Sequence, residues 1–166
     1  MNIDSQIKSA WSDNDYYKFD SIDVLWAFEY YEFISNGRFG NIPKGVVFQK
    51  DEETPYQLDL VYGDVATDIK VNTSSVTNNG DLNKLLLTIA VIAITFLARH
   101  PGYQIKLNGI NNVRTRLYRK FINIHIDALV SMVNIYGQNS VENLTELIRH
   151  SYNKDYDYLL VEIKNS

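Results

Sequence analysis

The chain has 166 residues, 45% of them apolar and 22% charged, which suits one folded domain with a single core and excludes a largely disordered chain. Its net charge of −4 disfavours a general nucleic-acid surface, and the absence of cysteine excludes disulfides, thiolate nucleophiles and cysteine-based zinc sites. The first residues lack the apolar core of a signal peptide, so we expect a cytosolic protein.

The first half of the chain predicts a β-meander. We expect residues 1–25 to form a peripheral segment, and β-strands to follow at 27–35, 42–50 and 56–64. These three stretches are rich in β-branched and aromatic residues and are separated by turn sequences. The first turn contains an Asn-Gly pair, in which we expect Gly37 to supply a positive φ angle.

A long apolar helix is predicted from about Asp81 to Arg99, with Pro101 ending it. The uncharged run Leu85–Ala98 is shorter than the roughly 20 apolar residues that span a bilayer, so we expect a buried core helix and no membrane anchor. Asp is a preferred N-cap residue, and we expect the Asp81 carboxylate to accept hydrogen bonds from the first N–H groups of this helix.

The second half of the chain alternates strands with helices. We expect strands at 103–110, 127–137 and 156–164, a basic helix at 111–124 and a short helix at 140–152. The resulting order is β-β-β-α-β-α-β-(α)-β. It predicts a single α+β domain covering residues 1–166, with a mixed, mostly antiparallel sheet and helices on both faces.

Two places could hold an anion. The turn at Asn79 and Gly80 precedes the long helix, whose first N–H groups and dipole favour negative charge, and Gly80 permits a close approach of the backbone. The basic helix brings cations together at helical spacing. This face is either simply solvated or a site for a phosphate, a nucleotide or an acidic partner segment. The candidate anion-binding or partner-binding residues are Lys84, Arg114, Arg116, Arg119 and Lys120.

No metal site is predicted. The three histidines, His100, His125 and His150, lack the spacing of metal ligands, and no HExxH sequence occurs. The carboxylates in the strands, notably Asp59 and Asp64, are more often exposed than functional.

Four segments, "FISNGRFGNIPKGVVF", "YQLDLVYGD", "TNNGDLNKLLLTIA" and "RTRLYRKFI", together resemble an uncharacterised bacterial and phage protein family over most of residues 27–164. The family pattern has a Ser-x-Gly-x-x-Gly turn, an Asn-Asn-Gly-Asp-x-x-Lys helix start and an Arg-Thr-Arg-Leu-Tyr helix. The resemblance implies no activity. The matching residues are Ser35, Gly37, Gly40, Lys44, Asn78, Asn79, Gly80, Asp81, Lys84, Arg114, Thr115, Arg116, Leu117 and Tyr118.

The predicted order of elements is also similar to the GNAT-type N-acyltransferase fold. In that family the long helix begins at a loop that holds the pyrophosphate of coenzyme A, so the resemblance implies cofactor contacts at Asn79 and Gly80. The family loop reads Arg or Gln-x-x-Gly-x-Gly or Ala. This chain has Thr77 at the first anchor, Gly80 at the second and Leu82 at the third.

A second GNAT-type segment, Asn-x-x-Ala-x-x-Leu-Tyr, lies beside the cofactor and carries a tyrosine that protonates the leaving thiolate. Asn111, Leu117 and Tyr118 fall at these spacings, with Arg114 in place of the alanine. The resemblance therefore implies a cofactor contact for Asn111 and a general-acid role for Tyr118.

We expect a non-catalytic interaction protein on a GNAT-like scaffold, with a protein partner and without a cofactor. The first alternative is a divergent acyl-CoA-dependent N-acyltransferase that uses acetyl-CoA. The second is a nucleotide-processing or nucleic-acid-processing protein with a ribonuclease-H-like arrangement. Whether the protein is an enzyme stays open at this stage.

Overall fold

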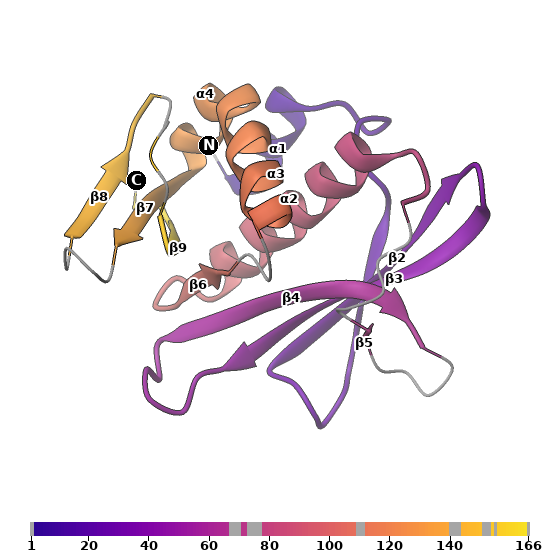
Figure 1. The fold of residues 1–166 in the computed structure, drawn as a ribbon, viewed down its shortest axis with the longest axis horizontal. Helices are drawn as coiled ribbons and strands as arrows, with labels where there is room; N and C mark the ends of the chain where they lie inside the picture. Colours follow the sequence, from indigo (N-terminus) through magenta and orange to yellow (C-terminus); the bar gives the residue numbers. More distant parts are fainter. Residues whose placement is uncertain are drawn as a thin grey trace.

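A computed structural model describes residues 2–66, 71–72, 78–108, 112–139, 144–150, 154 and 156–165. These residues form an α+β domain with one nine-stranded sheet and four helices (Figure 1). The elements in chain order are α1 (Ile3–Ala10), β1 (Phe19–Ile22), β2 (Glu29–Gly37), β3 (Gly40–Lys50), β4 (Gln57–Val65), β5 (Val71–Asn72), α2 (Leu82–Arg99), β6 (Gln104–Leu107), α3 (Asn112–Ile124), α4 (Ile126–Met132), β7 (Val133–Asn139), β8 (Leu144–Ile148) and β9 (Tyr158–Ile163).

The sheet has the strand order β1-β2-β3-β4-β6-β9-β7-β8. The short strand β5 stands outside this order and pairs with β4. The strands β2, β3 and β4 form the predicted antiparallel meander. The pair β4–β6 is parallel, and the other pairs are antiparallel. The predicted mixed, mostly antiparallel sheet is therefore confirmed.

The parallel contact between β4 and β6 is short. It covers only the first three residues of β4, from Gln57 opposite Gln104 to Asp59 opposite Lys106. Further along β4, strand β5 pairs with Asp64 and Val65. Between these two contacts, the stretch 60–63 of β4 pairs with β3 alone among the described strands.

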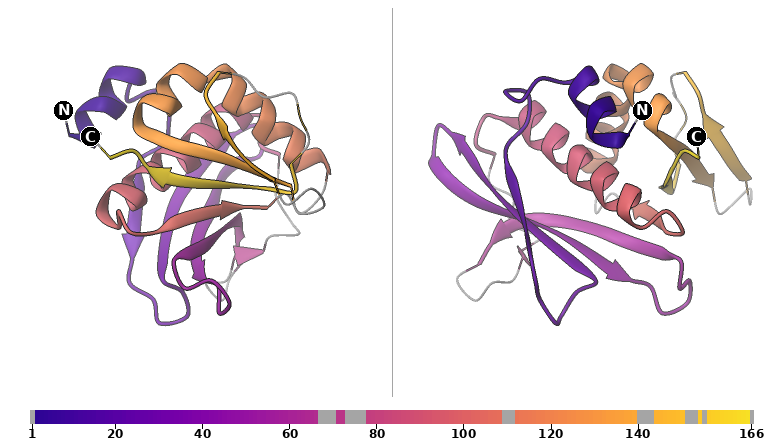
Figure 2. Two further views of the ribbon diagram at one scale, coloured as in Figure 1. Left: turned by 90° about the vertical axis from the view of Figure 1, so that its left-hand side faces the viewer. Right: turned by 180° about the vertical axis from the view of Figure 1, so that it is seen from behind.

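All four described helices lie on one side of the sheet, which curves around them (Figure 1 and Figure 2). The predicted placement of helices on both faces is therefore wrong. The strands alternate between a face covered by helices and an outer face. On β4, Leu58 and Leu60 are buried, whereas Asp59 between them points to the outer face and is only half-buried. Across the covered face, the Phe48 ring stacks on Phe96 of α2 with ring centroids 4.1 Å apart.

Helix α2 is the central helix of the core. Its length and composition alone would allow it to cross a membrane, but 56% of this span is buried inside the domain. Buried apolar side chains follow one another along the helix, and Thr88 among them donates to the carbonyl of Lys84 at 2.7 Å. The prediction of a buried core helix is confirmed.

Two predicted elements of the second half are wrong. The predicted strand at 127–137 consists of α4, which ends at Met132, and of β7, which begins at Val133. The predicted helix at 140–152 contains strand β8, which pairs with β7 as a hairpin. Short apolar runs fit the periodicity of a helix as well as that of a strand. Here the stretch is helical because α4 thereby buries Leu129 and Met132 against the core.

The N-terminal residues also contribute to the core. Helix α1 begins after Asn2, whose side chain accepts from the N–H of Ser5 at 2.9 Å and so caps the helix. Ile7 and Trp11 of this region are buried in the main cluster. Strand β1 follows and extends the sheet beyond the meander by pairing with β2.

Candidate functional site

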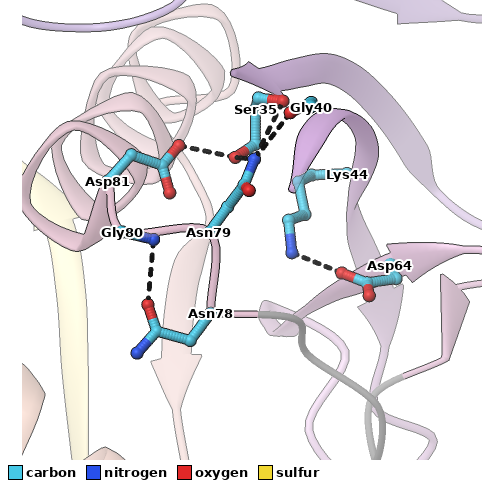
Figure 3. A network of polar contacts seen from close by, with 8 residues as sticks. All are labelled: Ser35, Gly40, Lys44, Asp64, Asn78, Asn79, Gly80 and Asp81. Carbon is cyan, nitrogen blue, oxygen red and sulfur yellow. Dashed lines mark hydrogen bonds and ion pairs between the residues drawn. The ribbon is translucent and has the colours of Figure 1, made fainter. Parts of the chain in front are cut away.

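The turn before α2 lies against the β2–β3 hairpin, and the two glycine-containing motifs of the sequence meet there (Figure 3). Asn79 is only 1% exposed. Its amide nitrogen donates to the carbonyl of Gly40 at 2.9 Å and to Ser35 Oγ at 3.1 Å, and its Oδ1 accepts from the N–H of Phe39 at 2.7 Å. One buried side chain thus satisfies several polar groups of the hairpin.

Asp81 occupies the N-cap position of α2, but its carboxylate does not cap the helix. The expected bond from Asp81 to the first N–H groups of α2 is therefore wrong. Its Oδ2 instead accepts from the hydroxyl of Tyr17 at 2.6 Å and from that of Ser35 at 2.5 Å. Burial, followed by the bond to Asp81, raises the pKa of the Tyr17 phenol. The carboxylate thus connects the start of α2 to β2 and to the segment before β1.

Three glycines permit this junction, for two different reasons. Gly37 is the last residue of β2, and a Cβ there would lie 1.9 Å from the carbonyl oxygen of Asn79. The positive φ that the sequence led us to expect at Gly37 occurs instead at Gly40, with φ 85°, and at Gly80, with φ 81°. The need at Gly37 is space for another part of the backbone.

A buried ion pair lies next to this junction on the helix-covered face of the sheet. The side chain of Lys44 is 1% exposed and pairs with Asp64, which is 19% exposed (Figure 3). The two residues face each other across β3 and β4. A lysine buried this deeply needs such a partner, because an isolated charge loses its hydration on burial.

The polar groups of the junction therefore bind mainly to one another. The N–H of Gly80 donates to Asn78 Oδ1 at 3.1 Å, and the carbonyl of Asn79 accepts from the N–H of Arg38 at 3.1 Å. This arrangement can hold the hairpin and the helix start rigidly together. Cofactor binding by Asn79 and Gly80 stays a prediction, and Asn111 lies outside the described residues.

Tyr118 of α3 lies at the wall of an apolar cavity of about 80 Å³. The cavity lies between α2, α3 and the sheet, and Leu60 of β4 and Leu107 of β6 also line it. Burial, followed by the neighbouring Tyr62, raises the pKa of the Tyr118 phenol, and Arg114 opposes this effect. Tyr118 is therefore neutral at physiological pH and could serve chemically as a proton donor.

The predicted basic residues do not form one cluster. The guanidinium of Arg114 lies over the Tyr62 ring, 4.8 Å from its centroid, and the ammonium of Lys84 lies over the Tyr17 ring at 4.5 Å. Arg119 is half-buried on α3. The remaining basic candidates are exposed and are taken up next.

The exposed residues in the stretch 114–124 of α3 form a single line. Between positions 114 and 124, only Arg116, Lys120 and Ile124 are exposed. They are four residues apart, which places them on one face of the helix. Ile124 is 61% exposed, so a large apolar side chain stands at the end of this line beside two cations. We call these three residues the α3 stripe.

The α3 stripe ends at a groove of about 470 Å³ between three parts of the chain. Lys84 and Leu87 line it from α2, and Phe121, Ile124 and His125 line it from the end of α3. The third wall is the segment after α1, which contributes Trp11, Asn14 and Asp15.

Trp11 and His125 connect two walls of this groove. The indole Nε1 of Trp11 donates to His125 Nδ1 at 3.3 Å, and burial lowers the pKa of His125 although Asp15 acts in the opposite direction. The acceptor role of Nδ1 fits a neutral imidazole. Sequence patterns did not indicate this site, because its residues come from three distant segments.

Comparison with known proteins identifies one family. The family described as a family of unknown function, DUF6934, matches residues 13–164. Among the curated proteins and the solved structures, no significant match to the chain was found.

Proposed function

Since the chain belongs to that family of unknown function, we propose its role from the geometry: it is a non-catalytic interaction protein that binds an acidic partner through the α3 stripe. The observation that carries this proposal is that, within the stretch 114–124 of α3, the exposed residues are Arg116, Lys120 and Ile124, in one line. Arginine is among the residues enriched at binding surfaces, and an apolar side chain beside it adds area that a partner can bury.

The scaffold of this proposal is GNAT-like. The order of the elements supports it: a meander, the long helix α2, strand β6, the helical segment of α3 and α4, and a final antiparallel set of strands. The ribonuclease-H-like alternative has less support. It calls for a cluster of carboxylates, and the described part of the chain contains no group of three or more His, Asp or Glu residues that could hold a metal ion.

A non-catalytic role is supported by the state of the motif residues. Ser35, Asn79 and Lys44 are buried and bind to other side chains or to the backbone of the domain. Side chains that are used in this way stabilise the fold and are not free to contact a substrate. The exposed α3 stripe, in contrast, has its charges available for a partner.

A peptide selection tests the proposal. A displayed library of random peptides is selected on the wild-type protein and on the variant Arg116→Glu/Lys120→Glu. We expect acidic peptides to be enriched on the wild type, and their affinity to fall about tenfold or more on the variant, because two attractive charges become repulsive.

The matched control is Arg38→Glu/Lys50→Glu, which reverses two exposed charges outside the groove. Each reversal changes the net charge by −2, so both double variants go from −4 to −8. Equal weakening by the two variants would trace the effect to overall charge and would contradict a binding role of the α3 stripe. The absence of acidic peptides among the selected sequences would contradict it as well.

The second candidate function is a divergent acyl-CoA-dependent acyltransferase. The observation that favours it is the position of Tyr118 beside an apolar cavity that reaches Leu60 of β4 and Leu107 of β6. In GNAT-type enzymes the tyrosine of this segment protonates the leaving thiolate. The Tyr118 phenol carries a proton to donate, although burial raises its pKa and so makes it a weaker acid than an exposed tyrosine, and the apolar cavity offers space for a short acyl group.

Calorimetry with acetyl-CoA separates the two candidates. The interaction proposal predicts no saturable heat at millimolar ligand, whereas the acyltransferase candidate predicts binding to both the wild type and Tyr118→Phe. It further predicts that an amine acceptor takes up the acetyl group with release of the coenzyme A thiol, and that Tyr118→Phe slows this release by about a hundredfold, since a positioned general acid contributes that much or more. A saturable heat with the wild type, together with slower release of the thiol by Tyr118→Phe, would favour the acyltransferase over the interaction protein.

A further inference from the structure

We infer that the groove beside the α3 stripe binds an extended segment of the acidic partner, with one large apolar side chain as its anchor. This inference rests on the proposed function and adds the chemistry and the spacing of the segment that is bound. The floor of the groove supports an apolar anchor, because Leu87, Phe121 and the buried Trp11 line it and Ile124 stands exposed at its edge.

The charges around the groove are distributed unequally. Arg116 and Lys120 continue from Ile124 along α3, and Lys84 lines the groove from α2. The segment after α1 contributes a carboxylate, Asp15, whose Oδ2 accepts from the N–H of Ser12 at 2.8 Å. Acidic residues of a partner are thus attracted along α3 and repelled at the wall that carries Asp15. The acidic residues are expected on one side of the anchor only.

The length of the surface favours a polypeptide over a small molecule. Arg116 precedes Ile124 by eight residues, which corresponds to roughly 12 Å along a helix that rises 1.5 Å per residue. An extended peptide advances about 3.3 Å per residue, and every second side chain points to the same face. If the apolar anchor of the peptide lies in the groove, the peptide side chain two positions from the anchor therefore lies near Lys120. The peptide side chain four positions from the anchor lies near Arg116.

The predicted partner segment thus has a defined pattern. It contains a large apolar residue, an acidic residue two positions away and a second acidic residue four positions away in the same direction. Side chains at the intervening positions point to solvent and are free to vary. This pattern is specific enough to be read directly from selected peptides.

Peptides selected on the wild-type protein are the probe for the test. One selected peptide is synthesised and titrated against Trp26→Phe, in which Trp11 is the single remaining tryptophan. Because Trp11 lines the groove, we expect its fluorescence to change on binding. We also expect Ile124→Ser, which removes the apolar side chain without adding a charge, to weaken binding by about tenfold through loss of an apolar contact at the edge of the groove. Ile124 is exposed, so this change leaves the core intact.

Paired substitutions test the spacing. Replacing the peptide acid at the second position by its amide should weaken binding to the wild type about threefold, the scale of an exposed ion pair, and have no effect on Lys120→Gln. The acid at the fourth position should show the same relation to Arg116→Gln. A merely structural role of Lys120 or Arg116 would weaken all peptides equally and would overturn the spacing.

The outcomes separate this inference from the proposed function. Acidic peptides without an apolar residue at the predicted spacing, or an unchanged affinity of Ile124→Ser, would overturn the inference and leave the binding role of Arg116 and Lys120 in place. A concentration-dependent change of Trp11 fluorescence without peptide, together with dimers in solution, would assign the groove to a second copy of the chain and would also overturn it.

Discussion

Replacing Gly37 with alanine is expected to lower the free energy of unfolding by about 3 kcal/mol, at the upper end of the cost of forcing extra atoms into a packed site. A Cβ at this position would lie 1.9 Å from the carbonyl oxygen of Asn79 and 2.8 Å from its Cγ. Neither atom can retreat freely, because the Asn79 carbonyl accepts from Arg38 and its side chain binds Gly40. Urea denaturation of the variant measures the loss.

Two other glycines provide the controls. Gly102→Ala meets no atom within 4 Å, and it should change stability by less than about 0.5 kcal/mol. Gly80→Ala also meets no atom within 4 Å, but its φ is 81°, so it should cost about 1 kcal/mol through backbone strain alone. If Gly37→Ala were no more destabilising than Gly80→Ala, the close approach between β2 and the Asn79 turn would be refuted.

Replacing Lys44 with methionine is expected to cost about 3 kcal/mol of stability. Methionine fills much of the space of the lysine chain but removes the positive charge from beside the Asp64 carboxylate. Breaking a buried ion pair at one partner is strongly destabilising, because the other charge stays in a poorly hydrated site. Asp64 keeps 19% exposure, so we expect the lower end of the usual range. Thermal and urea denaturation measure the effect.

The companion variants test this cause. Lys18→Met removes an exposed lysine and should be nearly neutral. The double variant Lys44→Met/Asp64→Leu should recover most of the loss, because an apolar pair can replace a buried ion pair at little cost. If the double variant were as unstable as the sum of the two single variants, the pair would contribute no coupling energy, and our account of Lys44 would be wrong.

The sequence predicted the fold well where a periodic pattern was long. The meander of β2, β3 and β4 and the core helix α2 were found at nearly their true positions, since alternation and a long apolar run each match one kind of element. The stretch 127–132 is predicted as part of a strand, because short apolar runs suit either a strand or a helix. Its helical form was decided by the burial of Leu129 and Met132 against the other helices.

The sequence motifs indicated residues of the glycine-containing junction but not the contacts between them. The motifs singled out Ser35, Asn79 and Asp81, but sequence alone could not show that they bind one another. A carboxylate at a helix start can cap that helix or bind a distant hydroxyl equally well. Asp81 binds distant hydroxyls, because those of Tyr17 and Ser35 donate to its carboxylate from positions 64 and 46 residues away along the chain.

The amino-acid sequence by itself determined the class of fold, the central core helix α2 and the cationic character of α3, because these follow from local composition and periodicity. The tertiary structure determined which of those cations are exposed and that a groove lies beside them. It also determined that the two glycine-containing motifs lie against each other. These properties depend on the distances between segments far apart in the chain. Such distances are set by the packing of the whole core, to which every element contributes.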